Sequence, residues 1–156
     1  MDEQLEHAWK IKDYVSQYIQ LADSKATSLV AVSTLGVGLL VLLPTKLLFF
    51  ESVLVGVSSL ILLISLVFAL VSLWPRTPKP SSGSGSIFWG SVSTYLSFAD
   101  YKTAFGKSQH LDEVLLQIFY ISKVAQNKYL WISRAVQWQA FGLVSLWLSF
   151  LIIRLF

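Results

Sequence analysis

Two short stretches of this chain combine residue types that could bind a ligand. Residues 22–26 place Asp23 and Lys25 immediately before an apolar run, and residues 87–90 place Phe88 and Trp89 after a Pro/Ser/Gly segment. Lysine can hold an anion, and an aromatic face can stack on a nucleobase. The commoner roles of such residues are structural: a charge pair that anchors a helix at a membrane surface, and an aromatic patch that docks one part of a chain onto another.

The chain carries no pattern typical of catalysis or of metal binding. His7 and His110 lack the neighbouring ligands and spacing of a zinc site, and cysteine is absent. No glycine-rich phosphate loop follows a strand, since Gly83 and Gly85 belong to a Ser/Gly segment. We therefore predict no catalytic residue, no metal site and no resident cofactor.

The composition predicts that lipid is the solvent for part of the chain. Of the 156 residues, 54% are hydrophobic and 13% are charged, whereas soluble proteins carry roughly 25% charged residues. The mean hydropathy is +0.62, and the apolar residues are clustered in runs. The net charge of +3 is not gathered into a basic stripe, so we predict no nucleic-acid partner.

The order of apolar and polar runs predicts an all-α membrane protein with three transmembrane helices. The first and third spans are expected to be extensions of long cytoplasmic helices, and a small helical cytoplasmic insert separates the second span from the third. The predicted segments are an amphipathic helix at 1–25, spans at 26–43, 52–74 and 136–155, a flexible linker at 75–86 and the insert at 87–135.

Missing helix breakers predict the two long helices. Neither proline nor glycine interrupts the chain between residue 1 and the first apolar run. Neither occurs between His110 and Val136, where the last apolar run begins. Within the insert, we expect one helix over residues 92–105 and another that begins near His110, with Asp112 and Glu113 in its first turn.

The distribution of basic residues predicts the orientation. Placing the N-terminus in the cytoplasm puts ten basic residues inside and two, Lys46 and Arg154, outside. The ten are Lys10, Lys12, Lys25, Arg76, Lys79, Lys102, Lys107, Lys123, Lys128 and Arg134. The N-terminal helix and residues 75–135 then share the cytoplasm, and the C-terminus lies outside.

The predicted spans contain no charged residue except Arg154 at one edge. Coupled transporters place ionisable groups near the middle of the membrane. A small channel or coupled transporter is therefore disfavoured, whereas a helix bundle that leaks or deforms the membrane when it rearranges is not.

Three blocks of residues, in this order, resemble the transmembrane effectors of the bacterial Pycsar antiphage system, and the resemblance covers nearly the whole chain. The matching positions are Asp23, Lys25 and Ala26, then Phe88 and Gly90, then Asp112, Gln117, Lys128 and Tyr129. The chain departs from the family pattern at Ser91, where an acid is expected, and at Asp112, which follows Leu111 where the family has an acid before a leucine.

This resemblance implies a function. A neighbouring pyrimidine nucleotide cyclase makes cyclic CMP or cyclic UMP on phage infection, and the messenger activates the effector. The effector then impairs the bacterial inner membrane, so that the cell dies before phage mature. We expect a non-enzymatic effector that forms a homo-oligomer in the lipid bilayer and binds a cyclic nucleotide.

The resemblance does not say which residues bind the messenger, so candidates follow from its chemistry. The cations expected at the phosphate are Lys25, Lys123, Lys128 and Arg134, and the aromatic side chains expected at the base are Trp89, Tyr95 and Tyr129. The alternative function is that of a structural or partner-binding membrane protein without a small-molecule ligand.

Overall fold

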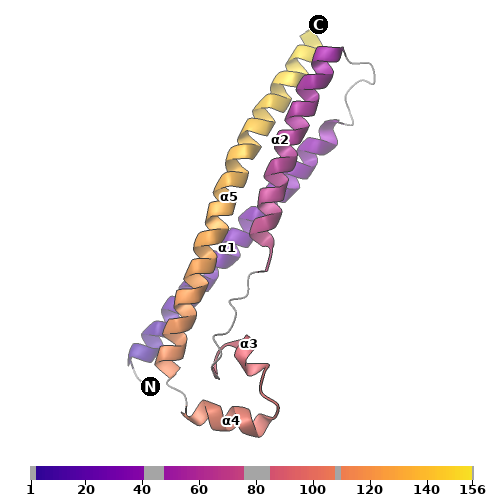
Figure 1. Cartoon of the computed structure of the whole chain (residues 1–156). Coiled ribbons are helices and arrows are strands. Elements are labelled where there is room, and N and C mark those ends of the chain that lie inside the picture. Colours follow the sequence, from indigo (N-terminus) through magenta and orange to yellow (C-terminus); the bar gives the residue numbers. More distant parts are fainter. Residues whose placement is uncertain (1–2, 41–47, 76–84, 108–109, 156) are drawn as a thin grey trace. The chain divides into compact units, whose positions relative to one another are not determined.

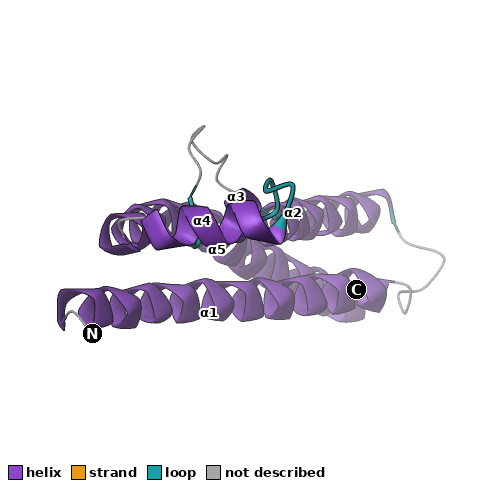
Figure 2. Cartoon of the chain, turned by 90° about the horizontal axis from the view of Figure 1, so that it is seen from below, coloured by secondary structure: helices purple, strands orange, loops and turns teal. Residues whose placement is uncertain are grey.

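The computed structural model of the chain describes residues 3–40, 48–75, 85–107 and 110–155, with only the backbone at Trp89 and Lys107. Throughout these residues the regular secondary structure is helical, and Figure 2 shows no strand in the described part. The elements in Figure 1 are α1 (Glu3–Leu39), α2 (Phe49–Leu73), α3 (Trp89–Val92), α4 (Phe98–Lys107) and α5 (His110–Leu155).

The chain forms two compact units. The first unit contains Met1–Gln20 and Pro75–Gln126, and the second contains Leu21–Trp74 and Asn127–Phe156. Helices α1 and α5 each supply residues to both units. The second unit holds the apolar parts of α1, α2 and α5, and the first holds most of the polar residues.

The expected continuity of the two long helices is confirmed. Helix α1 has 37 residues and α5 has 46, so α5 extends about 69 Å at the usual rise per residue. A bilayer core of about 30 Å needs about 20 helical residues. Helix α5 is therefore long enough to cross a membrane and to continue well beyond it.

Two helices in the described residues are long and apolar enough to cross a membrane, namely α2 and α5. Helix α1 does not meet the same criterion, and the predicted first span at 26–43 ends among residues outside the described part. The membrane crossing predicted at 26–43 therefore stays a prediction. Most of the predicted linker, residues 76–84, also lies outside the described residues.

The predicted single helix at 92–105 is wrong, because the structure has α3 and α4 separated by residues 93–97. Ser97 explains the break. Its hydroxyl accepts a hydrogen bond from the Asp100 N–H at 3.1 Å and donates one to the Asp100 carboxylate at 2.7 Å. The bond from the Asp100 N–H to the Ser97 hydroxyl is that of a helix N-cap, so the sequence restarts a helix where we expected one to continue.

The second unit is built on buried positions that recur every three or four residues. Alternating steps of three and four residues give a repeat of seven, which lets helices pack lengthwise with interlocking side chains. We call these positions the seam. The seam residues are Ala22, Ala26, Ser33 and Gly36 in α1; Ser58, Leu62, Ser65, Ala69 and Ser72 in α2; and Lys128, Ile132, Ala135, Gln139, Gly142, Leu146 and Ser149 in α5.

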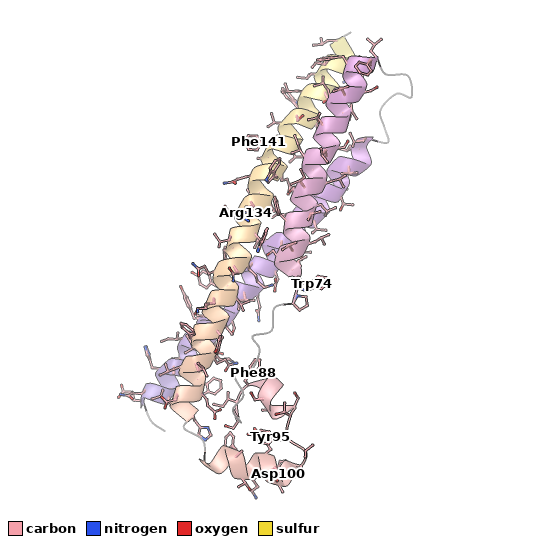
Figure 3. The ribbon with its side chains drawn as sticks, in the orientation of Figure 1. Trp74, Phe88, Tyr95, Asp100, Arg134 and Phe141 are labelled. Carbon is pink, nitrogen blue, oxygen red and sulfur yellow. The ribbon has the colours of Figure 1, made fainter. Side chains whose placement is uncertain are left out.

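The polarity of this unit is inverted relative to a water-soluble bundle. Small and polar side chains dominate the seam, while large apolar side chains point outward: Phe141 is 69% exposed and Leu70 is 48% exposed. Figure 3 shows Phe141 directed away from α5 and Trp74, which directly follows α2, directed away from that helix. Lipid solvates such an apolar surface, and small residues allow close approach of helices in lipid. Both features fit a membrane bundle.

Leu62 interlocks the three helices. A Cβ added at Gly142 would lie 2.7 Å from Leu62 Cδ2, and one added at Gly36 would lie 3.0 Å from Leu62 Cδ1. Both glycines therefore provide the space that the Leu62 side chain occupies. The contacts also fix the register of α1 and α5 against α2.

Replacing Gly142 tests this packing. Gly142→Ala is expected to lower the free energy of unfolding by about 1–3 kcal/mol, the usual cost of overpacking. Gly56→Ala in α2 is the matched control, because no described atom lies within 4 Å of its added Cβ. Unfolding in mixed detergent micelles, followed by circular dichroism, measures both. Equal stability of the two variants would contradict the packing described here.

Candidate functional site

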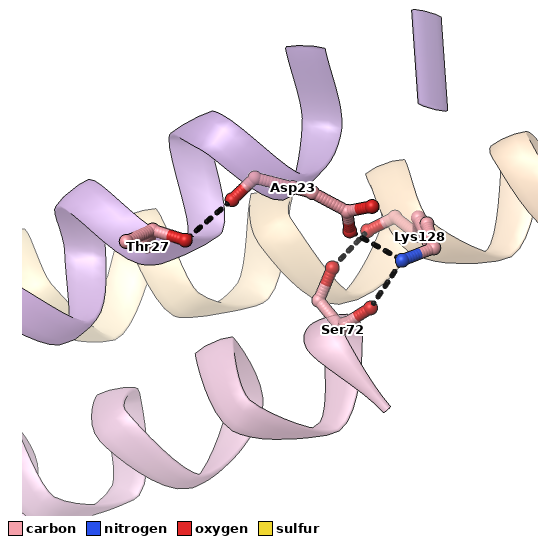
Figure 4. A network of polar contacts seen from close by, with 4 residues as sticks. All are labelled: Asp23, Thr27, Ser72 and Lys128. Atoms are coloured by element: carbon pink, nitrogen blue, oxygen red, sulfur yellow. Dashed lines mark hydrogen bonds and ion pairs between the residues drawn. The ribbon is translucent and has the colours of Figure 1, made fainter. Parts of the chain in front are cut away.

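The ammonium group of Lys128 joins the three helices of the second unit. Lys128 Nζ forms an ion pair with the Asp23 carboxylate of α1 and donates a hydrogen bond to the Ser72 carbonyl of α2 at 3.0 Å. The Ser72 hydroxyl in turn donates to the Lys128 carbonyl at 3.4 Å. Figure 4 shows these contacts. The C-terminal end of α2 is thereby tied to both long helices.

The two charges of this ion pair differ in their exposure. The Lys128 side chain is 6% exposed and that of Asp23 is 42% exposed. An unpaired charge in so buried a place is strongly unfavourable. Lys128 therefore depends on Asp23, whereas the carboxylate of Asp23 still reaches the surrounding medium.

Lys25 lies next to this network with its side chain exposed. Its Nζ sits 5.5 Å from the centroid of the Tyr129 ring, in the range of a cation–π contact. Tyr129 packs against a small core made by Ala22, Ala26 and Ile132. The structure thus brings together five family-motif positions, Asp23, Lys25, Ala26, Lys128 and Tyr129.

Arg134, another candidate cation, has a different environment. Its guanidinium carbon lies 4.9 Å from the Trp131 ring, which itself lies 5.6 Å from the ring of Phe68. Figure 3 shows Arg134 on α5. An arginine stacked on tryptophan at the start of an apolar segment is typical of a membrane-interface anchor.

The remaining candidates lie in the first unit. The Tyr95 ring is 5.6 Å from that of Tyr101, and the Tyr95 hydroxyl is buried without a hydrogen-bond partner among the described residues. The amide oxygen of Gln117 is in the same situation. Lys123 Nζ lies 4.2 Å from the Phe119 ring centroid and its side chain is exposed. The side chain of Trp89 lies outside the described part.

The motif positions Phe88 and Gly90 have a packing explanation. A Cβ added at Gly90 would lie 2.6 Å from Cε1 of Phe88. Glycine is therefore needed so that the Phe88 ring can fold back over the start of α3. The third block also includes Asp112, whose side chain is exposed in the first turn of α5.

Glu113 organises the first unit, a role that we did not expect from its position in a first turn. Its Oε2 accepts hydrogen bonds from the Ser86 N–H at 2.8 Å, the Ser86 hydroxyl at 3.0 Å and the Ile87 N–H at 3.1 Å. The Tyr101 hydroxyl donates to the Ser86 carbonyl at 3.2 Å. The last residue of the predicted linker and the residue after it are thus fastened to α5 and α4.

The His110 ring lies 4.4 Å from the Phe105 ring, at an interplanar angle of 44°. No group of three or more His, Cys, Asp or Glu residues in the described ranges could hold a metal ion. Elsewhere in the first unit, a hydrogen bond between the Tyr14 and Tyr18 hydroxyls at 3.0 Å raises the pKa of Tyr14. The contacts of His110 with Phe105 and of Tyr14 with Tyr18 pack side chains within the first unit.

Comparison with known proteins identifies one family. A family model described as a Pycsar effector protein domain matches residues 7–155. No curated protein and no solved structure matches the chain significantly. The match extends over both units and over every described motif position named above.

The difference in exposure between Asp23 and Lys128 predicts which of two single variants loses more stability. Asp23→Ala is expected to cost about 3 kcal/mol of stability, because it leaves the Lys128 charge buried without its counter-ion. Lys128→Met should cost less, since Asp23 can be hydrated. The double variant should be more stable than Asp23→Ala alone. Unfolding in mixed micelles measures this double-mutant cycle, and the reverse order of the single variants would contradict it.

Glu113 gives a second prediction. Hydrogen bonds to a charged acceptor contribute about 1.5–3 kcal/mol each, so Glu113→Ala should speed hydrogen exchange at the Ser86 and Ile87 amides by roughly tenfold or more. Asp112→Ala, a neighbouring exposed acid, is the control. Unchanged exchange in Glu113→Ala would show that the carboxylate does not hold this segment.

Proposed function

The chain belongs to the Pycsar effector protein domain family, and from that membership we propose that it is a membrane effector which cyclic CMP or cyclic UMP switches on. The family places it among antiphage defence effectors with a transmembrane domain. Activation by the messenger, impairment of the membrane and death of the infected cell are the proposed steps. The observation that carries the mechanism is the exposed Lys25 beside the ion pair of Asp23 with the buried Lys128.

The phosphate of the messenger is the first group to place. A cyclic mononucleotide carries one negative charge, and lysine provides both charge and hydrogen-bond donors. Lys128 is already occupied by Asp23 and by the Ser72 carbonyl. Lys25 is exposed, and turning from the Tyr129 ring toward a phosphate would cost only a weak cation–π contact. We therefore assign the phosphate to Lys25 and the neighbouring stacking surface to Tyr129.

A ligand at this place would act on the ion pair. A phosphate bound at Lys25 competes with the Asp23 carboxylate for the ammonium group of Lys128, because both are anions within reach of one buried cation. Losing Asp23 would weaken the attachment of α1 to α5 and α2. The messenger shifts the bundle toward an open state only if it binds that state more tightly, and competition for Lys128 provides such a difference.

The remaining assignments complete the proposal. The N-terminus and residues 75–135 face the cytoplasm, where the cyclase product is made, and the C-terminus lies across the inner membrane. Residues 26–43, 52–74 and 136–155 form three spans. Several copies assemble in the bilayer, with the cyclase as a partner through its product and without nucleic acid. Arg134 is assigned to the membrane surface through its contact with Trp131, and Trp89, Tyr95 and Lys123 stay candidates for further contacts with the messenger.

Reconstitution tests the function. Wild-type protein in liposomes loaded with K⁺ and a small dye is expected to release its contents on addition of cyclic CMP or cyclic UMP, and titration calorimetry should detect binding of the same nucleotide. Cyclic AMP is the control for the base. Neither release nor binding with both pyrimidine messengers would overturn the proposal and favour a partner-binding membrane protein.

Lys25 tests the site. Lys25→Met is expected to raise the messenger concentration for half-maximal K⁺ release by about tenfold, which corresponds to about 1.4 kcal/mol of lost phosphate binding. Lys10→Met is the matched control, because Lys10 is another exposed lysine of α1, and its ammonium group forms a surface ion pair with Glu6. Equal dose dependence in the two variants would remove Lys25 from the site.

A further inference from the structure

We propose that the buried seam of the second unit lines a narrow water-filled path through the membrane, which Leu62 closes in the resting state. This inference rests on the proposed permeabilisation of the membrane and names the route. The occupants are water and small hydrated monovalent cations.

A column of hydroxyl groups runs along the seam of α2. Ser58, Ser65 and Ser72 recur every seven residues, and each is fully buried. Their hydroxyls turn toward α5: Ser58 lies 2.7 Å from the Ser145 hydroxyl, and Ser65 donates to the Ala135 carbonyl at 2.8 Å. These hydroxyls can exchange a helix partner for water at little cost, because water offers the same hydrogen bonds.

Two further polar atoms in the seam have no such partner. The Ser33 hydroxyl of α1 and the Gln139 amide oxygen of α5 are buried, at 0% and 5% residue exposure, and form no hydrogen bond with any described residue. Polar atoms buried without partners are costly, and water bound between polar groups is the usual remedy. These two atoms therefore indicate bound water, which a seam that served only in packing would not need.

Ser33, Ser65 and Gln139 belong to one level of the bundle. Leu62 contacts the positions of Gly36 and Gly142. Ser33 and Gln139 precede these two glycines by three residues, and Ser65 follows Leu62 by three. Because α2 runs antiparallel to α1 and α5, all three steps lead toward the same end of the bundle. For α5 this order follows from the contacts of Ser72 with Lys128 and of Ser58 with Ser145. For α1 it follows because Asp23 meets Ser72 through Lys128, whereas Gly36 faces Leu62. One polar side chain from each helix therefore contributes to a common polar layer.

Leu62 blocks the path next to this layer. Between Ser58 and Ser72, the buried positions of α2 are serine or alanine except for Leu62, whose side chain is fully buried. It fills the space left by the two glycines of α1 and α5. A hydrophobic constriction of this kind closes a pore by excluding water, and opening needs only enough helix separation to wet it.

The outer face of α2 is apolar. Its exposed side chains include Val53, Val57, Leu60, Leu63, Val67 and Leu70. Such a face fits lipid and cannot carry hydrated ions. Along α2, the seam is therefore the face that suits water and cations.

Substitution of the constriction tests the gate. Leu62→Ser in K⁺-loaded liposomes is expected to release K⁺ at least tenfold faster than wild type without any messenger. Leu63→Ser is the matched control, because Leu63 is the next residue of α2 and is 46% exposed. Equal release from the two variants, with both folded by circular dichroism, would overturn the gate.

Thiol accessibility tests the path independently of the gate variant. The chain contains no cysteine, so Ser65→Cys and the outward-facing Val67→Cys are single labels in the otherwise natural protein. A charged methanethiosulfonate reagent should modify Ser65→Cys at least tenfold faster once the messenger is added, and Val67→Cys should stay unreactive. Equal modification of both positions, or of neither while the messenger releases K⁺, would show that ions cross by general bilayer disruption.

These outcomes separate the inference from the proposed function. If wild-type protein does not respond to either messenger but Leu62→Ser leaks, the messenger assignment fails and the seam path stands. If wild-type protein responds and neither the gate variant nor the thiol label behaves as expected, the effector function stands and the seam path is wrong.

Discussion

The second unit depends on the ion pair and the hydrogen bond that the buried ammonium group of Lys128 forms. A charge with 6% exposure needs its counter-ion and its hydrogen bonds in place, and here these come from two other helices, from Asp23 and Ser72. Packing in lipid lacks the hydrophobic driving force that holds soluble bundles together. One polar junction can therefore have a large influence on whether the helices stay associated, and it makes that association sensitive to a competing anion.

The seam that extends from this junction has the properties of a metastable assembly. Close packing is provided by Leu62 against Gly36 and Gly142, while serine hydroxyls bridge α2 and α5. Two buried polar atoms, on Ser33 and Gln139, lack partners among the described residues. Such a bundle loses little when water replaces the contacts between helices. In the proposed mechanism, the same small and polar residues would hold the closed bundle together and allow it to open.

Much of the architecture could be predicted from the sequence. Unbroken helix-forming runs predicted the continuity of α1 and α5, and 23 uncharged residues at 52–74 predicted α2, whose observed bounds are Phe49–Leu73. The break between α3 and α4 was missed, because Ser97 can either cap a helix or lie within one, and only the geometry of Asp100 decides. The resemblance to Pycsar effectors was confirmed by the family match over residues 7–155.

The candidate site could be predicted only in part. Asp23, Lys25, Lys128 and Tyr129 were singled out, but their separation of about one hundred residues hides the ion pair. The sequence indicated Lys128 as a candidate cation for the phosphate, but it did not indicate that Asp23 and Ser72 contact the same ammonium group. The seam was also hidden, because a repeat of serine, alanine and glycine has none of the contrast in hydropathy by which amphipathic helices are recognised.

The central claim is that the messenger separates helices which Lys128 holds together. Spin labels on cysteines introduced at Leu35 of α1 and Phe141 of α5, both 69% exposed, allow their distance to be measured by pulsed electron paramagnetic resonance in liposomes. The account predicts that cyclic CMP or cyclic UMP shifts the distribution to longer distances, and that Asp23→Ala shifts it without messenger. An identical distribution in all three conditions, in protein that releases K⁺ on messenger addition, would contradict the account.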